Sequence, residues 1–330
     1  MRRLAAVVLT AALGGMACSD DPATEATEST RSTSSTVSTS TSTSMPDTPS
    51  EFAVGSRTIV LVDPSRPTAA DPSRDLEARP DRTMPVLLLY PADGPVVTPT
   101  APADGAPAAD GAFPLVVFSH GVTSTGPTYQ GRIQEWARAG YVVAAPTYPL
   151  SSGPGGVIGD YVNQPADVSF VIDELLALPA DDPLGGLIDD EAVAAAGHSL
   201  GAITTLGVSL NSCCADERID VAVEISGLRL PFPGGDFANL GRIPFLAIHG
   251  AADQTVPVSG SDTLVEEAPG GAAYLRFPEG GHSDILVSDG PLIDQVVIAF
   301  LDAHLEDDPV GLAEVPDAVV DSGRATFAVT

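Results

Sequence analysis

The chain has 330 residues, of which 44 are acidic and 15 basic, and its formal net charge is −29. All the basic residues are arginine, which excludes chemistries that need a lysine: a P-loop, a pyridoxal Schiff base or a Ser-Lys dyad. The scarcity of positive charge also argues against nucleic-acid binding and against docking onto anionic lipid through a basic patch. Hydrophobic residues make up 44% of the chain, enough for a large buried core.

The N-terminus has the pattern of an export signal. A short positive segment, 1–3, precedes an apolar run, 4–17, that is too short to span a bilayer and ends at Cys18. This resembles a bacterial lipoprotein signal, which implies that residues 1–17 are removed and that Cys18 is lipidated. The alternative is an ordinary secretory signal with a Cys near its cleavage point. We therefore expect a cell-envelope lipoprotein anchored on the outer face of the membrane, or a secreted protein.

A polar segment follows the signal. Residues 18–50 are rich in Ser, Thr and small acidic residues, and 29–44 contain little else. Such a segment cannot bury enough apolar surface to offset its ordering entropy, so we expect a disordered tether. The folded domain is then 51–330, a length that one α/β domain can reach.

Within 51–330, short apolar runs alternate with segments whose apolar residues recur at helical spacing. The expected strands are 57–62, 85–90, 114–119, 141–145, 193–196, 221–225, 245–248 and 272–277. The expected helices are 129–139, one opened by Pro165, then 200–210, 259–267 and 291–304. We predict an exposed loop over 91–111, and the tail after Glu306 shows no pattern. Continuous apolar strands separated by helices predict a mostly parallel sheet with helices on both faces.

The strongest chemical signal is Gly197-His198-Ser199-Leu200-Gly201, which follows a strand and precedes a helix. This is the context of a nucleophile elbow, a sharp turn that lifts a serine hydroxyl above the sheet. Small residues on either side let the neighbouring backbone approach. The alternative is a plain strand-to-helix turn, since Gly and Ser are common residues. We predict that Ser199 is a nucleophile.

A second motif, Phe118 to Val122, ends the third expected strand. Acyl transfer needs backbone donors at fixed positions to stabilise an oxyanion. We predict that the N–H groups of Val122 and Leu200 form this oxyanion hole. For His120 we expect a role in ordering the loop by hydrogen bonding rather than one as general base.

The carboxylate that would orient a catalytic histidine is predicted to be Asp253, three residues beyond a strand that ends at His249-Gly250. The alternative is a turn Asp that caps the next loop. The main rival acid is Glu224, which lies inside a strand run, and Asp236 on a Gly-rich loop is a weaker one.

The general base is predicted to be His282, on a loop between the last strand and the C-terminal helix. The other candidates are placed less suitably: His198 lies in the elbow, His249 ends a strand and His304 is on a helix. The histidines show no metal-ligand spacing such as H-E-x-x-H, so we expect no metal and no cofactor.

Cys213 and Cys214 are adjacent and follow the elbow helix. In an exported protein they can pair with each other, although neighbouring cysteines are closer than the usual Cα separation of a disulfide. The alternative is two half-buried thiols; we favour the vicinal disulfide.

Together these motifs resemble the α/β-hydrolase superfamily over about 57–304, with the order Ser199, Asp253, His282. The nearest resemblance is to the group of platelet-activating-factor acetylhydrolase-like enzymes, chlorophyllases and bacterial polyester hydrolases. It rests on the opening strand pair that ends in Tyr90-Pro91, on the 118–121 loop and on the elbow. One departure is Ser226, where mammalian acetylhydrolases carry their acid; the acid would here lie one strand later, as in dienelactone-hydrolase-like enzymes.

The resemblance implies a carboxylic ester hydrolase of lipase or esterase type, with a Ser-His-Asp triad and an acyl-enzyme intermediate. Only 151–164 and 228–240 could cover the site, so we expect no large lid domain and a rather open cleft. The expected partner is a small-molecule or polymeric ester, with no nucleic acid, and the chain is expected to be a monomer that meets the membrane only through its N-terminal lipid. The competing hypothesis is a surface lipoprotein that binds a ligand without catalysis.

Overall fold

The computed structural model describes residues 51–96, 101–268 and 270–330. The predicted signal 1–17, the lipidation site Cys18 and the tether 18–50 lie outside the described residues. The chain divides into two units, Met1–Pro46 and Asp47–Thr330, and the described residues belong to the second. Among its described residues, no helix has both the length and the apolar character needed to cross a membrane.

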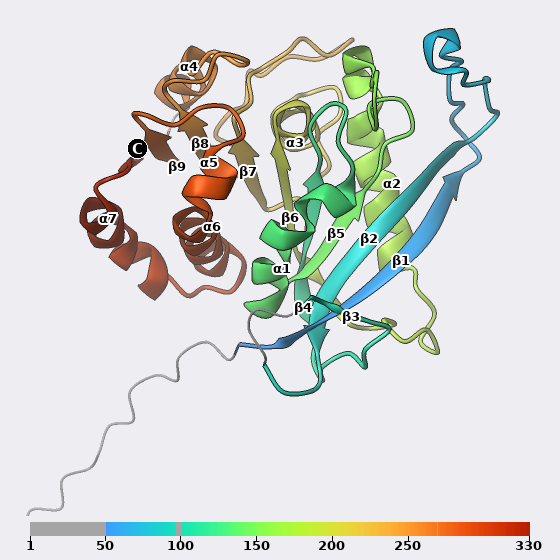
Figure 1. The fold of residues 1–330 in the computed structure, drawn as a ribbon, viewed down its shortest axis with the longest axis horizontal. Helices are drawn as coiled ribbons and strands as arrows, with labels where there is room; N and C mark the ends of the chain where they lie inside the picture. Colours follow the sequence, from blue (N-terminus) through green and yellow to red (C-terminus); the bar gives the residue numbers. More distant parts are fainter. Residues whose placement is uncertain (1–50, 97–100, 269) are drawn as a thin grey trace, which may run out of the picture. The chain divides into compact units, whose positions relative to one another are not determined.

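The described residues form a single central sheet with helices around it (Figure 1). Its strands are β1 (Ala53–Asp63), β2 (Arg82–Ala92), β3 (Ala103–Asp104), β4 (Phe113–Ser119), β5 (Val142–Pro146), β6 (Ile188–His198), β7 (Val221–Ile225), β8 (Phe245–Gly250), β9 (Ala272–Phe277) and β10 (Thr326–Val329). The helices are α1 (Gln130–Arg138), α2 (Gln164–Leu176), α3 (Leu200–Leu210), α4 (Ser259–Glu267), α5 (Ile285–Ser288), α6 (Gly290–Leu305) and α7 (Val310–Ser322), with short 3-10 helices η1 (Pro72–Arg74), η2 (Gly126–Tyr129) and η3 (Ile158–Val162).

The strand order is β10-β9-β8-β7-β6-β4-β5-β2-β1-β3. Strands β4 to β9 are mutually parallel, whereas β2 runs antiparallel to β1 and β5, and β10 runs antiparallel to β9. Every residue of β4, β5, β7 and β8 is buried, because helices cover both faces of a parallel sheet. The prediction of a mostly parallel α/β sheet is confirmed.

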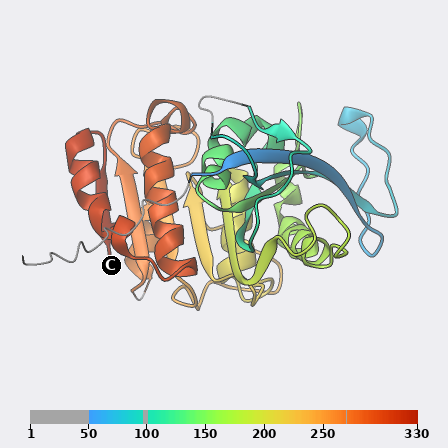
Figure 2. The ribbon, with the colours of Figure 1, turned by 90° about the horizontal axis from the view of Figure 1, so that it is seen from below.

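Two helical layers bury the two faces. The apolar sides of α1, α6 and α7 pack on one face, and those of α2, α3 and α4 pack on the other. Figure 2 shows the long, curved β1 at one end of the sheet and α6 and α7 at the other. The loops that leave the carboxyl ends of β4, β6, β8 and β9 carry the predicted site residues, which is where open α/β sheets place their ligands.

The expectation of an unpatterned tail was wrong. Residues after Glu306 form α7 and then β10, which pairs with β9. Leu312, Val315 and Val319 recur at helical spacing and pack on the core, but Pro316 interrupts the pattern within the helix. Within the predicted loop 91–111, the two-residue β3 pairs with β1.

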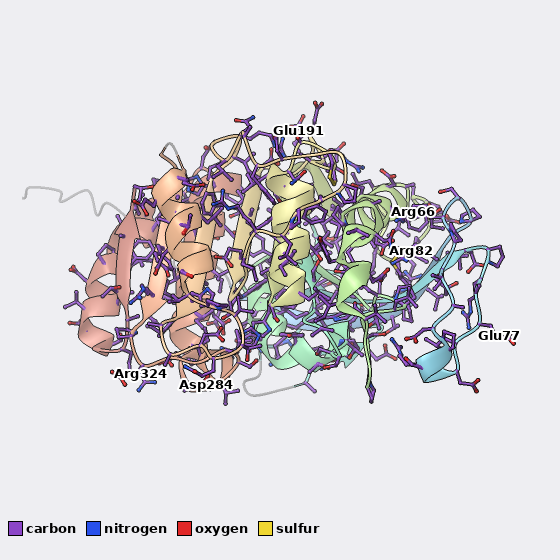
Figure 3. The ribbon with its side chains drawn as sticks, turned by 90° about the horizontal axis from the view of Figure 1, so that it is seen from above. Arg66, Glu77, Arg82, Glu191, Asp284 and Arg324 are labelled. Atoms are coloured by element: carbon purple, nitrogen blue, oxygen red, sulfur yellow. A yellow bond between two sulfur atoms is a disulfide. The ribbon has the colours of Figure 1, made fainter. Side chains whose placement is uncertain are left out.

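One ion cluster in the core was not predicted. Arg82 on β2 is buried, and its guanidinium donates to Asp167 on α2 at 2.8 and 2.5 Å and to Asp160 on η3 at 3.2 and 3.1 Å. Arg66 reaches Asp167 from the rim at 2.8 Å. Figure 3 shows the two arginines close together beside α2. The cluster fixes the segment 158–176 against the sheet.

The two segments expected to reach over the site touch each other. The hydroxyl of Tyr161, in 151–164, donates to the carbonyl of Pro231, in 228–240, at 2.5 Å. The rings of Tyr161 and Phe232 meet edge to face with 5.1 Å between centroids. Phe232 in turn packs on Leu200, so the two segments cover the start of α3 together.

Candidate active site

Ser199 occupies the turn between β6 and α3 with φ 58° and ψ −118°, a conformation that non-glycine residues rarely adopt. Its N–H donates to the carbonyl of Ile225 on the neighbouring strand at 2.9 Å. A Cβ on Gly201 would overlap the carbonyl oxygen of Ser119, and one on Gly197 would overlap the backbone of Gly201. The two glycines are therefore required by the close approach of three backbone segments, which is the geometry of a nucleophile elbow.

The structure brings Ser199, His282 and Asp253 together. The Oγ of Ser199 lies 2.9 Å from Nε2 of His282, and Nδ1 of His282 lies 2.7 Å from Oδ2 of Asp253. A carboxylate only accepts, so Nδ1–H donates to Asp253 and Nε2 is free to accept the serine proton. This is the geometry of a Ser-His-Asp triad.

The other Asp253 oxygen is held by backbone. Its Oδ1 accepts the N–H groups of Thr255 at 2.7 Å and Val256 at 2.8 Å. Burial opposes ionisation, but the hydrogen bonds from Val256, His282 and Thr255 prevail and hold the pKa of Asp253 below its usual range. Asp253 is thus an anion whose second oxygen faces the imidazole.

The rival acids lie elsewhere. Asp236 exchanges hydrogen bonds with Ser212 on an exposed loop. Glu224 is buried and contacts Ser261 and the Gly227 amide, and among the described residues it makes no hydrogen bond to His282.

Sequence reasoning missed the role of His198 and Tyr129. The Gly121 N–H donates to the Tyr129 hydroxyl at 3.2 Å, and that hydroxyl lies 2.8 Å from Nδ1 of His198. The other ring nitrogen, Nε2, donates to the carbonyl oxygen of His282 at 3.0 Å. Burial lowers the pKa of His198 to about 4, so the ring is neutral and can accept on one side while it donates on the other.

The oxyanion loop is ordered by His120, as predicted for that residue. The Tyr148 N–H donates to Nε2 of His120 at 3.1 Å, so Nδ1–H donates to the Gly121 carbonyl at 2.7 Å. Of the successive amides in this loop, Gly121 donates to Tyr129 and Thr123 to the Ser151 carbonyl. The amide between them, that of Val122, remains our predicted oxyanion donor.

Leu200, the second predicted donor, is the first residue of α3. An N–H in the first turn of a helix has no intrahelical partner, and the positive end of the helix dipole favours an anion there. The placement is compatible with an oxyanion hole.

A cleft of about 650 Å³ opens on the triad. Its lining combines the loop after β4, the η2–α1 segment and the 282–287 segment: Gly121, Val122, Ser124, Thr128, Tyr129, Gly131, Arg132, His198, Ser199, Thr255, His282, Ser283, Leu286 and Val287. Arg132 is the cation of this lining, and its Nη1 lies 2.8 Å from Oδ2 of Asp294. The one arginine of the lining is thus paired, and apolar surface makes up most of the cleft as a whole.

Cys213 and Cys214 are joined in a vicinal disulfide in the structure. They pack against Leu200 and Ile203 of α3 and against Phe232. Within the described ranges, no group of three or more His, Cys, Asp or Glu side chains could hold a metal ion.

The strand order, the turn at Ser199 and the contacts among Ser199, His282 and Asp253 are those of an α/β-hydrolase fold. The model of the chlorophyllase family matches residues 96–227, which contain the oxyanion loop and the elbow. A ferulic acid esterase from Streptomyces cinnamoneus has the same fold, with a TM-score of 0.65 and 23% identity over 86% of this chain and 98% of that one. The search of curated proteins gave no match. The family match covers part of the chain, and the solved structure shows the same fold.

Proposed function

We propose that this protein hydrolyses carboxylic esters through an acyl-enzyme formed on Ser199. The observation that carries the proposal is the continuous contact from Ser199 Oγ to His282 to Asp253, at 2.9 and 2.7 Å, on the wall of an open cleft. A non-catalytic ligand-binding protein has no need of a serine held in a rare backbone conformation against a histidine.

The proposed reaction has two halves. Ser199 Oγ attacks the acyl carbon while His282 Nε2 takes its proton, and Asp253 stabilises the imidazolium that forms. The amides of Val122 and Leu200 hold the oxyanion of the tetrahedral intermediate. His282 then protonates the departing alcohol. In the second half His282 activates a water, which releases the carboxylic acid and restores Ser199.

The apolar wall of the cleft favours an uncharged ester. Val122, Leu286 and Val287 line it, and Val287 is 86% exposed, so a long or bulky group can extend outward. The solved structure with the same fold is that of an esterase of ferulic acid, an aryl-substituted acid. We therefore propose esters that carry an aryl or extended apolar group as substrates, and an exposed chain of a polyester as a further candidate.

The test is hydrolysis of p-nitrophenyl esters from acetyl to palmitoyl, of methyl ferulate and of a polyester film. Ser199→Ala should abolish release of product without changing the melting temperature. Ser322→Ala, at the remote end of α7, is the matched control and should keep full activity. Folded wild-type protein that releases product from no ester would overturn the proposal and favour the ligand-binding hypothesis.

A further inference from the structure

Behind the triad lies a second row of buried polar side chains that the proposed reaction does not use. His249 ends β8, Glu224 lies on β7 and Ser261 lies on α4, and each is at most 1% exposed. All three face the layer of α3 and α4, because β7 and β8 alternate their side chains between the two faces.

These side chains continue the triad in one line of contacts. Nε2 of His249 lies 3.2 Å from Oδ2 of Asp253, the same oxygen that accepts from His282. Nδ1 of His249 lies 2.7 Å from Oγ of Ser261. That hydroxyl lies 2.5 Å from Oε1 of Glu224, whose Oε2 accepts the Gly227 N–H at 2.9 Å.

The number of hydrogens that these contacts need constrains the protonation of His249 and Glu224. Nε2 of His249 also lies 3.1 Å from the carbonyl of Val256, so with two acceptors before it that nitrogen must carry a hydrogen. The contacts of Ser261 with His249 and with Glu224 each need one hydrogen as well. Three contacts thus need three hydrogens, but a neutral imidazole and a hydroxyl supply two. The third must come from a proton retained by Glu224 or by His249.

Burial favours a proton on Glu224 over a second proton on His249. Glu224 is fully buried, and loss of hydration raises the pKa of its carboxyl, although His249, Ser261 and Gly227 oppose this. The titratable groups that act on it are His249 on β8 and Tyr274 on β9, whose hydroxyl donates to Asp262 on α4, and α3 contributes none. No cation other than the imidazole itself faces the Glu224 carboxyl from these elements, so a neutral acid is the favoured form.

We propose that His249 is a positioning residue for Asp253, kept in its Nε2–H form by Ser261 and a protonated Glu224. Glu224 donates to Ser261, Ser261 donates to Nδ1 of His249, and Nε2–H of His249 donates to the carbonyl of Val256. The same nitrogen lies 3.2 Å from Oδ2 of Asp253. His249 thereby fixes the turn whose Thr255 and Val256 amides hold the other Asp253 oxygen, so His282 meets a carboxylate that cannot rotate. The inference rests on the proposed function for its catalytic consequence, but not for the protonation states.

Three substitutions in the full-length protein separate the roles. Ser261→Ala leaves Nδ1 of His249 without its hydrogen-bond donor, so the ring is held less firmly against Val256 and Asp253; we expect kcat to fall about 10- to 100-fold with KM nearly constant. Glu224→Gln keeps a donor toward Ser261 and an acceptor for Gly227, so we expect activity within about twofold of wild type. Glu224→Ala removes the donor and should resemble Ser261→Ala.

The matched control is Ser209→Ala on α3. Ser209 is also fully buried, and its hydroxyl has no hydrogen-bond partner among the described residues. Its loss tests the effect of removing a buried hydroxyl alone. If Ser261→Ala and Ser209→Ala have the same kcat, the positioning role is overturned.

A spectroscopic readout is independent of turnover. The ¹⁵N shifts of His249 at neutral pH should show a neutral ring protonated at Nε2 in wild type and in Glu224→Gln, and in Ser261→Ala a displaced Nδ1 shift that reports the lost hydrogen bond. An imidazolium signal in wild type, or a loss of activity in Glu224→Gln equal to that in Ser261→Ala, would overturn the protonated Glu224. Absence of ester hydrolysis would refute the proposed function, but the ¹⁵N shifts would still report the protonation of His249 and its contact with Ser261.

Discussion

Nε2 of His198 lies 3.0 Å from the carbonyl oxygen of His282, so the residue before the elbow serine holds the loop that carries the triad histidine. Through Tyr129 the same ring also reaches Gly121 in the oxyanion loop. One neutral imidazole therefore fixes two of the loops that meet at Ser199, and its protonation would end the hydrogen bond that it accepts from Tyr129.

The burial of a neutral His198 predicts that the fold loses stability in acid. Because burial lowers the pKa of His198 to about 4, the unfolded chain binds a proton at this residue between pH 6.5 and 4 that the folded chain does not. The free energy of unfolding should therefore fall as the pH falls through that window. In His198→Gln, denaturant midpoints from pH 7.5 to 4.5 should decline less steeply than in wild type. Equal slopes in both proteins would contradict the assignment.

Asp253→Asn should lower kcat by about 10⁴-fold, because an amide in that place favours the wrong tautomer of His282. Initial rates with a p-nitrophenyl ester measure the effect. Asp236→Asn, a change of the exposed rival acid, should leave the rate unaltered. Comparable losses in the two variants would reassign the orienting carboxylate.

A glycine-to-alanine substitution should lower the free energy of unfolding at the elbow but not on α1. Gly201→Ala forces a methyl group into the Ser119 carbonyl and should lower the free energy of unfolding by about 1–3 kcal/mol or more. Gly131→Ala, on α1 where a Cβ meets nothing within 4 Å, should raise it by about 0.5–1 kcal/mol. Urea denaturation distinguishes them, and equal effects would argue against a backbone contact at the elbow.

The Arg82 cluster predicts a large stability loss. Arg82→Met leaves Asp160 and Asp167 buried without a full partner and should cost about 3–5 kcal/mol. Adding Asp167→Asn should recover part of this. Arg229→Met removes a partly exposed pair with Glu267 and should cost under about 1 kcal/mol in the same urea titration.

For the N-terminus, we propose that Cys18 carries a lipid. Expressed in a bacterial host, the full chain should incorporate a fatty-acid analogue, and Cys18→Ala should abolish the label and release the protein from the membrane fraction. The Cys213→Ser/Cys214→Ser double variant should stay labelled. Label that persists in Cys18→Ala would disprove acylation there.

The residues whose roles depend on local sequence were predictable. Ser199, Asp253 and His282 each follow a strand on a loop, and the parallel order of strands brings such loops to one edge. His249, Glu224 and Ser261 carry no such local signal, since their contacts join β7, β8 and α4 across one face of the sheet. The same holds for Arg82, whose partners lie 78 and 85 residues away in the chain.

The C-terminal strand β10 borders the sheet and so affects which strand edges are left unpaired. The sheet is bordered by β10, with four residues, on one side and by β3, with two, on the other. Long parallel strands would otherwise offer rows of free amides and carbonyls as templates for another chain. β10 covers β9 along four residues, whereas β3 covers only Gly55 and Ser56 of β1, so the longer unpaired edge lies on β1. Deletion of the last turn and strand should leave β9 as a second unpaired edge that can bind another chain.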